Sequence, residues 1–134
     1  MEPYPNSVPD ELIAGLVAAW NRHDMTAFAS VFHEDAAFVN VVGTYARGRR
    51  GIEQLHATAH ASFYRNCTIS MRLEDARMAA ADVIVAHVTS DVRGDERAPD
   101  QVRETIMTLV IERQHGLWKI SAAHNTAVAV PMNP

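Results

Sequence analysis

The stretch Phe32-His33-Glu34-Asp35-Ala36-Ala37-Phe38-Val39-Asn40-Val41-Val42-Gly43 carries the strongest structural signal in this chain. His33-Glu34-Asp35 is typical of an acidic turn that follows a helix end. Residues 36–42 form an apolar run typical of a short strand, and Gly43 then predicts a hairpin turn. Asn40 is the polar side chain within that run. We expect this strand to line one wall of a ligand pocket, with Asn40 pointing into it.

Composition predicts one compact domain. The chain has 134 residues, of which 48% are hydrophobic, and this is enough apolar surface for a core. Charged residues make up 21% of the chain and the net charge is -4, so we expect no nucleic-acid partner, because phosphate binding needs a dense basic face. The basic cluster at residues 47–50 is short and is interpreted as a solvated turn before a helix.

The same composition bears on the compartment. No apolar run approaches the roughly 20 residues that a membrane-spanning helix needs, so we expect no membrane partner. The N-terminus shows no basic region followed by an apolar core, and we expect no signal peptide. The single cysteine, Cys67, cannot form an intrachain disulfide, which favours a reducing cytoplasm. Cys67 lies in an alternating apolar pattern and is interpreted as a packing residue.

Hydrophobic periodicity divides the chain into two halves. The first half has a helical period and predicts a helix over residues 9–20, a short helix capped by Asp24, and a third helix over 52–64. The second half alternates with a period of two and predicts strands over residues 67–74, 82–92, 102–113 and 117–128, after a short strand at 44–47. Helices followed by meandering strands predict an α+β fold with helices on one face of a curved antiparallel sheet. We expect a lead-in at residues 1–8, one domain over 9–130 and a tail at 131–134.

Four histidines are predicted to lie near the interior. Counting by two places His124 on the same face of the last strand as Trp118 and Ile120, and Thr126 shares that face. His56 and His60 are neighbours on the third helix, and His87 lies in a valine-rich strand. A cavity with two or more imidazoles can exchange protons near neutral pH. The alternative is that each histidine is singly hydrogen-bonded or partly exposed, and we favour this alternative for His60 and His87.

Other kinds of site have weaker signals. The spacing of His56 and His60 suits a metal, but a third ligand would have to come from another element, so we predict no metal site. The sequence has no glycine-rich phosphate loop or dinucleotide fingerprint, and we expect no cofactor. Trp20 is a candidate cavity wall and Tyr45 a candidate hydroxyl donor, although ordinary packing is the alternative for both. Tyr64 is also a possible hydroxyl donor, and its sequence context does not raise it above packing.

The order of several motifs resembles a known family. These motifs are Ala19-Trp20-Asn21, Phe32-His33-Glu34-Asp35-Ala36, Asn40-Val41-Val42-Gly43, Gly48-Arg49 before a helix with His56, Leu117-Trp118-Lys119-Ile120 and His124-Asn125-Thr126. Together they resemble the nuclear transport factor 2-like superfamily, in its SnoaL-like branch, and within that branch the SgcJ/EcaC group found in bacteria. The resemblance implies a cone-shaped domain in which three helices and a curved sheet enclose a deep pocket, usually in a homodimer.

The resemblance also bears on chemistry. Relatives include ketosteroid isomerases, polyketide cyclases and dehydratases, and in the isomerases an aspartate on the first strand abstracts a proton. Asn40 stands where the resemblance places that base, and an asparagine cannot take up a proton at neutral pH. The isomerase mechanism is therefore not expected to operate through this position.

Two main hypotheses follow, with a purely structural scaffold as a third. The first is a pocket for a hydrophobic small molecule, such as a polyketide-like metabolite, with isomerase, cyclase or dehydratase chemistry in which His124 is the acid and base while Asn40 and His56 orient the ligand. The second is a non-catalytic binding or carrier dimer. The dimer is predicted to form through the outer sheet face, where Val102, Ile106 and Val110 alternate with inward-facing residues.

Overall fold

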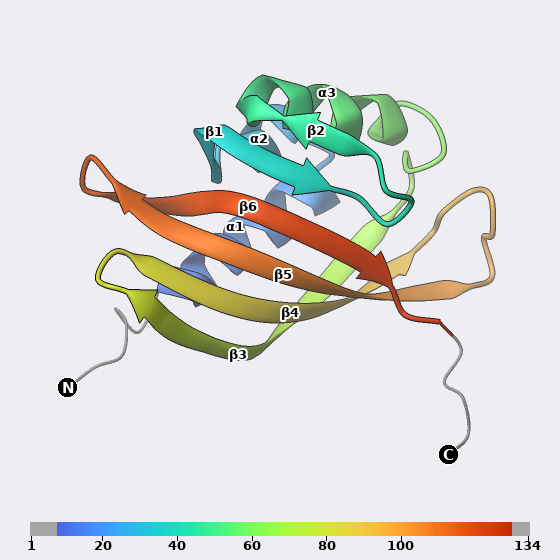
Figure 1. Ribbon diagram of the computed structural model, residues 1–134. Helices are drawn as coiled ribbons and strands as arrows, with labels where there is room; N and C mark the ends of the chain where they lie inside the picture. Colours follow the sequence, from blue (N-terminus) through green and yellow to red (C-terminus); the bar gives the residue numbers. More distant parts are fainter. Residues whose placement is uncertain (1–7, 130–134) are drawn as a thin grey trace, which may run out of the picture.

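Three helices lie on one side of a six-stranded sheet (Figure 1). The computed structural model describes residues 8–129, so most of the expected lead-in and the whole expected tail lie outside the described residues. The helices are α1 (Val8–Asn21), α2 (Met25–Ala29) and α3 (Gly48–His60). No helix in the described part of the chain is both long and apolar enough to cross a membrane.

The ends of two helices have local causes. Asp24 caps α2 as predicted, because its side chain accepts a hydrogen bond from the backbone N–H of Ala27 at 3.0 Å. Helix α3 begins and ends four residues earlier than the periodicity predicts. It begins at Gly48, whose φ of 77° turns the chain directly out of the preceding strand. It ends at His60 because the carbonyl of Ala59 accepts hydrogen bonds from the N–H groups of Ser62 and Tyr64, which form a turn.

The six strands form one curved sheet in the order β2-β1-β6-β5-β4-β3. Their bounds are β1 (Phe32–Val39), β2 (Tyr45–Arg47), β3 (Thr68–Ala80), β4 (Val83–Arg93), β5 (Val102–Gln114) and β6 (Leu117–Ala127). All neighbouring pairs are antiparallel except β1 and β6, which are parallel. The predicted α+β class, with helices against one face of a curved sheet, is confirmed.

The core lies between the helices and the inner face of the sheet. Alternate residues of β4 and β5 point inward and are buried: Ile84, Ala86, Val88, Ser90, Val92, Thr105, Met107, Leu109 and Ile111. On the helical side, Leu16, Trp20, Phe28 and Ile52 complete this core. Burial of apolar surface contributes about 25 cal/mol of folding free energy per Å², and it is the main term that stabilises such an arrangement.

The predicted outer face of β5 is also confirmed. Val102 and Ile106 are exposed and Val110 is partly exposed, whereas Thr105 and Met107 between them are buried. The sheet therefore presents a row of apolar side chains on the side away from the helices.

The opening stretch of the sequence differs from its prediction. Strand β1 begins at Phe32, includes the residues expected to form an acidic turn, and ends at Val39, three residues before the expected end. The side-chain oxygen of Asn40 accepts hydrogen bonds from the N–H groups of Val42 and Thr44, at 3.1 and 2.8 Å. Because these bonds satisfy the backbone locally, residues 40–43 form a turn instead of continuing the strand. Val42 is consequently 78% exposed.

Candidate ligand-binding site

A cavity of about 390 Å³ lies between the helices and the inner face of the sheet. This volume falls within the roughly 300–1,000 Å³ that is usual for small-molecule sites. Its walls are mainly apolar and come from both layers of the fold: Leu16, Trp20, Phe28, Phe32, Phe38, Leu55, Phe63, Ile69, Met71, Val92 and Met107. These walls suit the apolar body of an organic molecule.

Three of the predicted site residues line this cavity: Trp20, His56 and Asn40. Trp20 is buried and its ring contacts those of Phe28 and Tyr64, with centroids 6.1 and 5.4 Å away. The side-chain oxygen of Asn40 is already occupied by the turn described above. Only its amide N–H groups remain available to a ligand.

Among residues 8–129, His56 is the histidine that lines the cavity. Its Nδ1 lies 2.8 Å from the carbonyl oxygen of Ile52, so Nδ1 carries the proton and donates, while Nε2 is left as an acceptor. The ring lies between Phe28 and Phe38, with centroids 4.6 and 4.7 Å away. Burial lowers the pKa of His56 to about 4, because the charged imidazolium loses its hydration. His56 is therefore neutral at physiological pH.

His124 and Thr126 do not face the cavity, and their predicted orientation is wrong. Both are exposed on the outer side of β6. In the pairing of β5 with β6, Val110 lies opposite Ala122 and Ile111 lies opposite Ile120, so Ser121 has no partner. This extra residue is a β-bulge, which reverses the alternation of side chains beyond it.

The bulge turns Asn125 inward in place of its neighbours. Asn125 lines the cavity, and its Oδ1 is buried without a hydrogen-bond partner among the described residues. Nearby, the buried hydroxyl groups of Ser90 and Thr105 on adjacent strands are hydrogen-bonded to each other at 3.0 Å. These three polar side chains form the sheet side of the cavity together with Met107.

His87 and Tyr45 also lie outside the cavity. His87 is on the outer face of β4, where its Nδ1 is 2.8 Å from Oδ1 of the exposed Asp75. Both faces of β4 are rich in valine and isoleucine, so periodicity alone does not show which face is buried. Tyr45 is 59% exposed on the short strand β2, where Ala46 is the buried residue.

His60 is buried and does not line the cavity. Its Nδ1 lies 2.8 Å from Nδ1 of His23, and its ring packs edge-on against Trp20 with centroids 4.5 Å apart. Loss of hydration lowers the pKa of His60 to about 4, with smaller contributions from His23 and His56. His60 thus supports Trp20 from behind the cavity wall.

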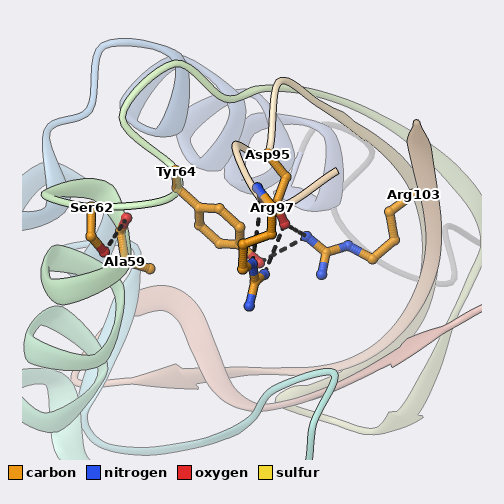
Figure 2. A network of polar contacts seen from close by, with 6 residues as sticks. All are labelled: Ala59, Ser62, Tyr64, Asp95, Arg97 and Arg103. Atoms are coloured by element: carbon orange, nitrogen blue, oxygen red, sulfur yellow. Dashed lines mark hydrogen bonds and ion pairs between the residues drawn. The ribbon is translucent and has the colours of Figure 1, made fainter. Parts of the chain in front are cut away.

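Sequence reasoning missed a polar network at one end of the cavity (Figure 2). Asp95 and Arg97 come from the loop between β4 and β5, Arg103 from the start of β5, and Tyr64 from the turn after α3. Arg97 donates two side-chain hydrogen bonds to the carboxylate of Asp95, from Nε at 3.0 Å and from Nη2 at 2.8 Å. Nη2 of Arg103 donates to Asp95 and to the hydroxyl of Tyr64, both at 2.9 Å. We call these four residues the Asp95 network.

The Asp95 network places two cations beside the cavity. The side-chain hydrogen bond from Arg97 is the main cause that lowers the pKa of Asp95, and the charge of Arg103 adds to it. Asp95 is therefore ionised at neutral pH. Arg97 and Arg103 line both the cavity and a groove that adjoins it on the surface. One signal for Arg103 was present in the sequence, because it shares the inward face of β5 with Thr105 and Met107.

The described residues form neither a metal-ligand cluster nor a reactive thiol. Within residues 8–129, no three side chains of histidine, cysteine, aspartate or glutamate lie close enough to hold a metal ion. Cys67 is buried, and burial raises the pKa of its thiol to about 11. A thiol with so high a pKa is a poor nucleophile at neutral pH.

Residues 13–120 match the SnoaL-like domain family, and the chain belongs to that family. Its fold is of the cystatin-like, nuclear transport factor 2-like kind that the structural neighbours share. Comparison with curated protein sequences gave no match.

Three solved structures illustrate the likeness. An uncharacterised protein with a cystatin-like fold from Caulobacter vibrioides is 27% identical, with 92% of this chain and 89% of that chain covered and a TM-score of 0.82. A ketosteroid isomerase-like protein from Erwinia carotovora atroseptica is 10% identical, with 95% and 100% covered and a TM-score of 0.75. A hexachlorocyclohexane dehydrochlorinase, LinA-type3, from Novosphingobium barchaimii LL02 is 17% identical, with 96% and 94% covered and a TM-score of 0.78. Similarities at these low identities concern the fold.

Proposed function

We propose that this protein binds a small, mostly apolar organic molecule in the cavity between its helices and its sheet. The observation that carries the proposal is an aromatic cavity of about 390 Å³ into which a few polar groups converge. His56 offers a hydrogen-bond acceptor, Asn125 an amide, and Arg97 and Arg103 cationic donors. Apolar walls with few, well-placed polar groups are the usual anatomy of small-molecule sites.

The geometry favours binding over proton abstraction. None of the described residues that line the cavity is an aspartate or glutamate, and the nearby carboxylate of Asp95 is held by two arginines. Asn40 cannot act as a base, and the pKa of His56, about 4, is far below the near-neutral value that suits a general base. We therefore place the non-catalytic binding or carrier function first.

A second candidate function is acid and base catalysis of the isomerase, cyclase or dehydratase type. One observation favours it: the bond from Nδ1 of His56 to Ile52 fixes the tautomer and leaves Nε2 free at the cavity. Two neighbours that share the fold are described as ketosteroid isomerase-like and as a dehydrochlorinase. In this chain His56 would carry the chemistry, in place of His124. Turnover of a substrate that is unchanged by His56→Ala, in a variant that still folds, would exclude this role.

The binding proposal is tested with a neutral apolar probe, 2-acetylnaphthalene, by isothermal titration calorimetry. Ala59 lines the cavity, so Ala59→Phe fills it and should abolish binding, whereas Ala57→Phe on the exposed side of the same helix should not. In a Trp118→Phe background, bound probe should also quench the fluorescence of Trp20. Binding that is equal in the two alanine variants would contradict the proposed location.

The proposal extends to the ligand class, the subfamily, the assembly and the cellular compartment. The aromatic walls suit a polyketide-like metabolite, and the order of motifs supports membership of the SgcJ/EcaC group. The apolar outer face of the sheet supports a homodimer, with Val102, Ile106 and Val110 at its interface. The single buried cysteine supports the cytoplasm as the compartment, since thiols stay reduced there.

A further inference from the structure

We propose that the Asp95 network is a subsite for a carboxylate group, so that the ligand is a small apolar carboxylic acid bound in its ionised form. This inference rests on the proposed binding function and names the chemical class of the ligand. The apolar body would lie against the aromatic walls, and the carboxylate would meet Arg97 and Arg103 at the end of the cavity next to the surface groove.

The first argument is the unbalanced charge of the network. Two guanidinium groups share one carboxylate, because Nη2 of Arg97 and Nη2 of Arg103 both reach Oδ2 of Asp95, at 2.8 and 2.9 Å. The network therefore carries one net positive charge. Among residues 8–129, the cavity lining includes no acidic residue that could neutralise it. A net charge beside apolar walls favours an anion there, since charges interact more strongly where water is partly excluded.

The second argument is the number of unused donors. A guanidinium group has five N–H donors. The hydrogen bonds of Arg103 to Asp95 and Tyr64 both come from Nη2, which leaves the donors on Nε and Nη1. Arg97 uses Nε and Nη2 on Asp95. In Figure 2, a nitrogen of each guanidinium points away from Asp95. Planar groups with paired donors match the geometry of a carboxylate.

The third argument is that the subsite is already organised. The guanidinium of Arg97 stacks on the ring of Phe63 at 3.8 Å from its centroid. The backbone N–H of Arg97 also donates to Oδ1 of Asp95 at 3.0 Å, and the N–H of Glu96 donates to the carbonyl of Phe63 at 3.0 Å. The loop between β4 and β5 is thereby tied to the turn that follows α3. A ligand that meets groups already held in place loses less entropy on binding.

The charge balance favours a monoanion over a phosphate ester. One carboxylate neutralises the single net positive charge, whereas a phosphate monoester brings close to two negative charges at pH 7. Asp91 and Glu104 line the adjoining groove and not the cavity, so an anion is repelled in the groove and is favoured on the cavity side of the arginines.

The test compares two probes with the same apolar body, 2-naphthoate and neutral 2-acetylnaphthalene, by calorimetry at pH 7. Charge-assisted hydrogen bonds should make 2-naphthoate bind about tenfold tighter or more. Arg103→Met should remove that preference, because it should weaken the binding of 2-naphthoate about tenfold and that of 2-acetylnaphthalene much less, since an uncharged carbonyl gains less from a cationic donor. Arg77→Met, at an exposed arginine of β3, is the matched control for net charge and should keep the preference. The probe 2-naphthyl phosphate should bind more weakly than 2-naphthoate.

Additional variants test whether removing a positive or a negative charge changes the affinity for 2-naphthoate in opposite directions. Arg97→Met repeats the test if Arg103→Met does not fold. Asp95→Asn removes the competing negative charge but also the anion that holds the two guanidinium groups, so its expected effect is on the ratio of the two affinities: 2-naphthoate should gain relative to 2-acetylnaphthalene. Equal binding of the two probes by the unmodified protein, or a preference that survives both arginine variants, would overturn the carboxylate subsite alone. Failure of both probes to bind would overturn the proposed function, and this inference with it.

Discussion

The substitution Asp95→Asn should destabilise the fold by about 2–3 kcal/mol, because Asp95 is a largely buried carboxylate that bridges two arginines. Its side chain is 11% exposed, and those of Arg103 and Arg97 are 26% and 52% exposed. An asparagine keeps the shape but loses the charge, and its amide places two N–H donors where a guanidinium also donates. The two guanidinium groups would then repel each other without an anion between them.

The magnitude follows from where this cluster lies between two limits. Breaking a fully buried ion pair costs about 3–5 kcal/mol, and an exposed pair contributes about 0–1 kcal/mol. Arg103 is mostly covered whereas Arg97 is half exposed, so the buried value is reduced to about 2–3 kcal/mol. For a chain of this length that loss lowers the melting temperature by about 6–15 °C.

The assay is urea denaturation of the unmodified protein and the variant at several pH values. The pKa of Asp95 in the folded protein lies below its ordinary value of 3.8, so the stabilisation is fully present above that value. It is lost as the pH falls through the folded pKa. The difference between the two proteins should therefore be constant near neutral pH and shrink in acid below about pH 4.

The matched control is Asp82→Asn. Asp82 also accepts a hydrogen bond from an arginine, Nε of Arg113 at 2.9 Å, but the two side chains are 52% and 48% exposed. This substitution should cost about 1 kcal/mol or less. Equal costs at Asp82 and Asp95, or a difference at Asp95 that grows in acid, would refute the reasoning.

Three further predictions concern other parts of the fold. Gly94→Ala should destabilise the fold more than Gly43→Ala, as measured by thermal melts. Both glycines have positive φ, but only at Gly94 would an added Cβ lie 2.5 Å from a backbone oxygen, that of Asn66. Equal losses of stability would contradict this clash. Stability should fall between pH 6.5 and about 4, because the unfolded chain binds protons there that the buried His56 and His60 do not. His56→Gln should make this part of the pH profile less steep and leave the contribution of His60. Ile106→Glu on the outer sheet face should convert the proposed dimer to a monomer in sedimentation, and a monomeric unmodified protein at micromolar concentration would exclude that dimer.

Much of the fold was predictable because its signals are local. Helical spacing in the first half and alternation in the second identify the helices and the strands, and the inward-facing residues of β5 follow from the alternation. Asp24 predicts its helix cap for the same reason, since the cap involves residues three positions apart. The ends of β1 and α3 were less predictable, because a turn around Asn40 ends the strand early and because Gly48, at positive φ, starts the helix four residues before the predicted position.

The site was harder to predict because its parts meet only in the folded chain. A single unpaired residue, Ser121, reverses the alternation of β6, so that Asn125 lines the cavity and His124 faces away. No local pattern marks such a bulge, since the residues on both sides of it remain compatible with a strand. His124 was therefore assigned to the wrong face of β6, whereas His87 was misplaced because both faces of β4 are rich in valine and isoleucine.

The sequence alone established the class of fold, the apolar core, and Trp20, Asn40 and His56 as residues of the cavity wall. Tertiary structure decided which polar groups surround the cavity. Tyr64, Asp95 and Arg103 belong to three segments that look polar or unremarkable by themselves, and they form hydrogen bonds only because the loop after β4 folds against the turn after α3. Hydrophobic periodicity reports whether a residue is buried; it carries no information on which distant charges become neighbours.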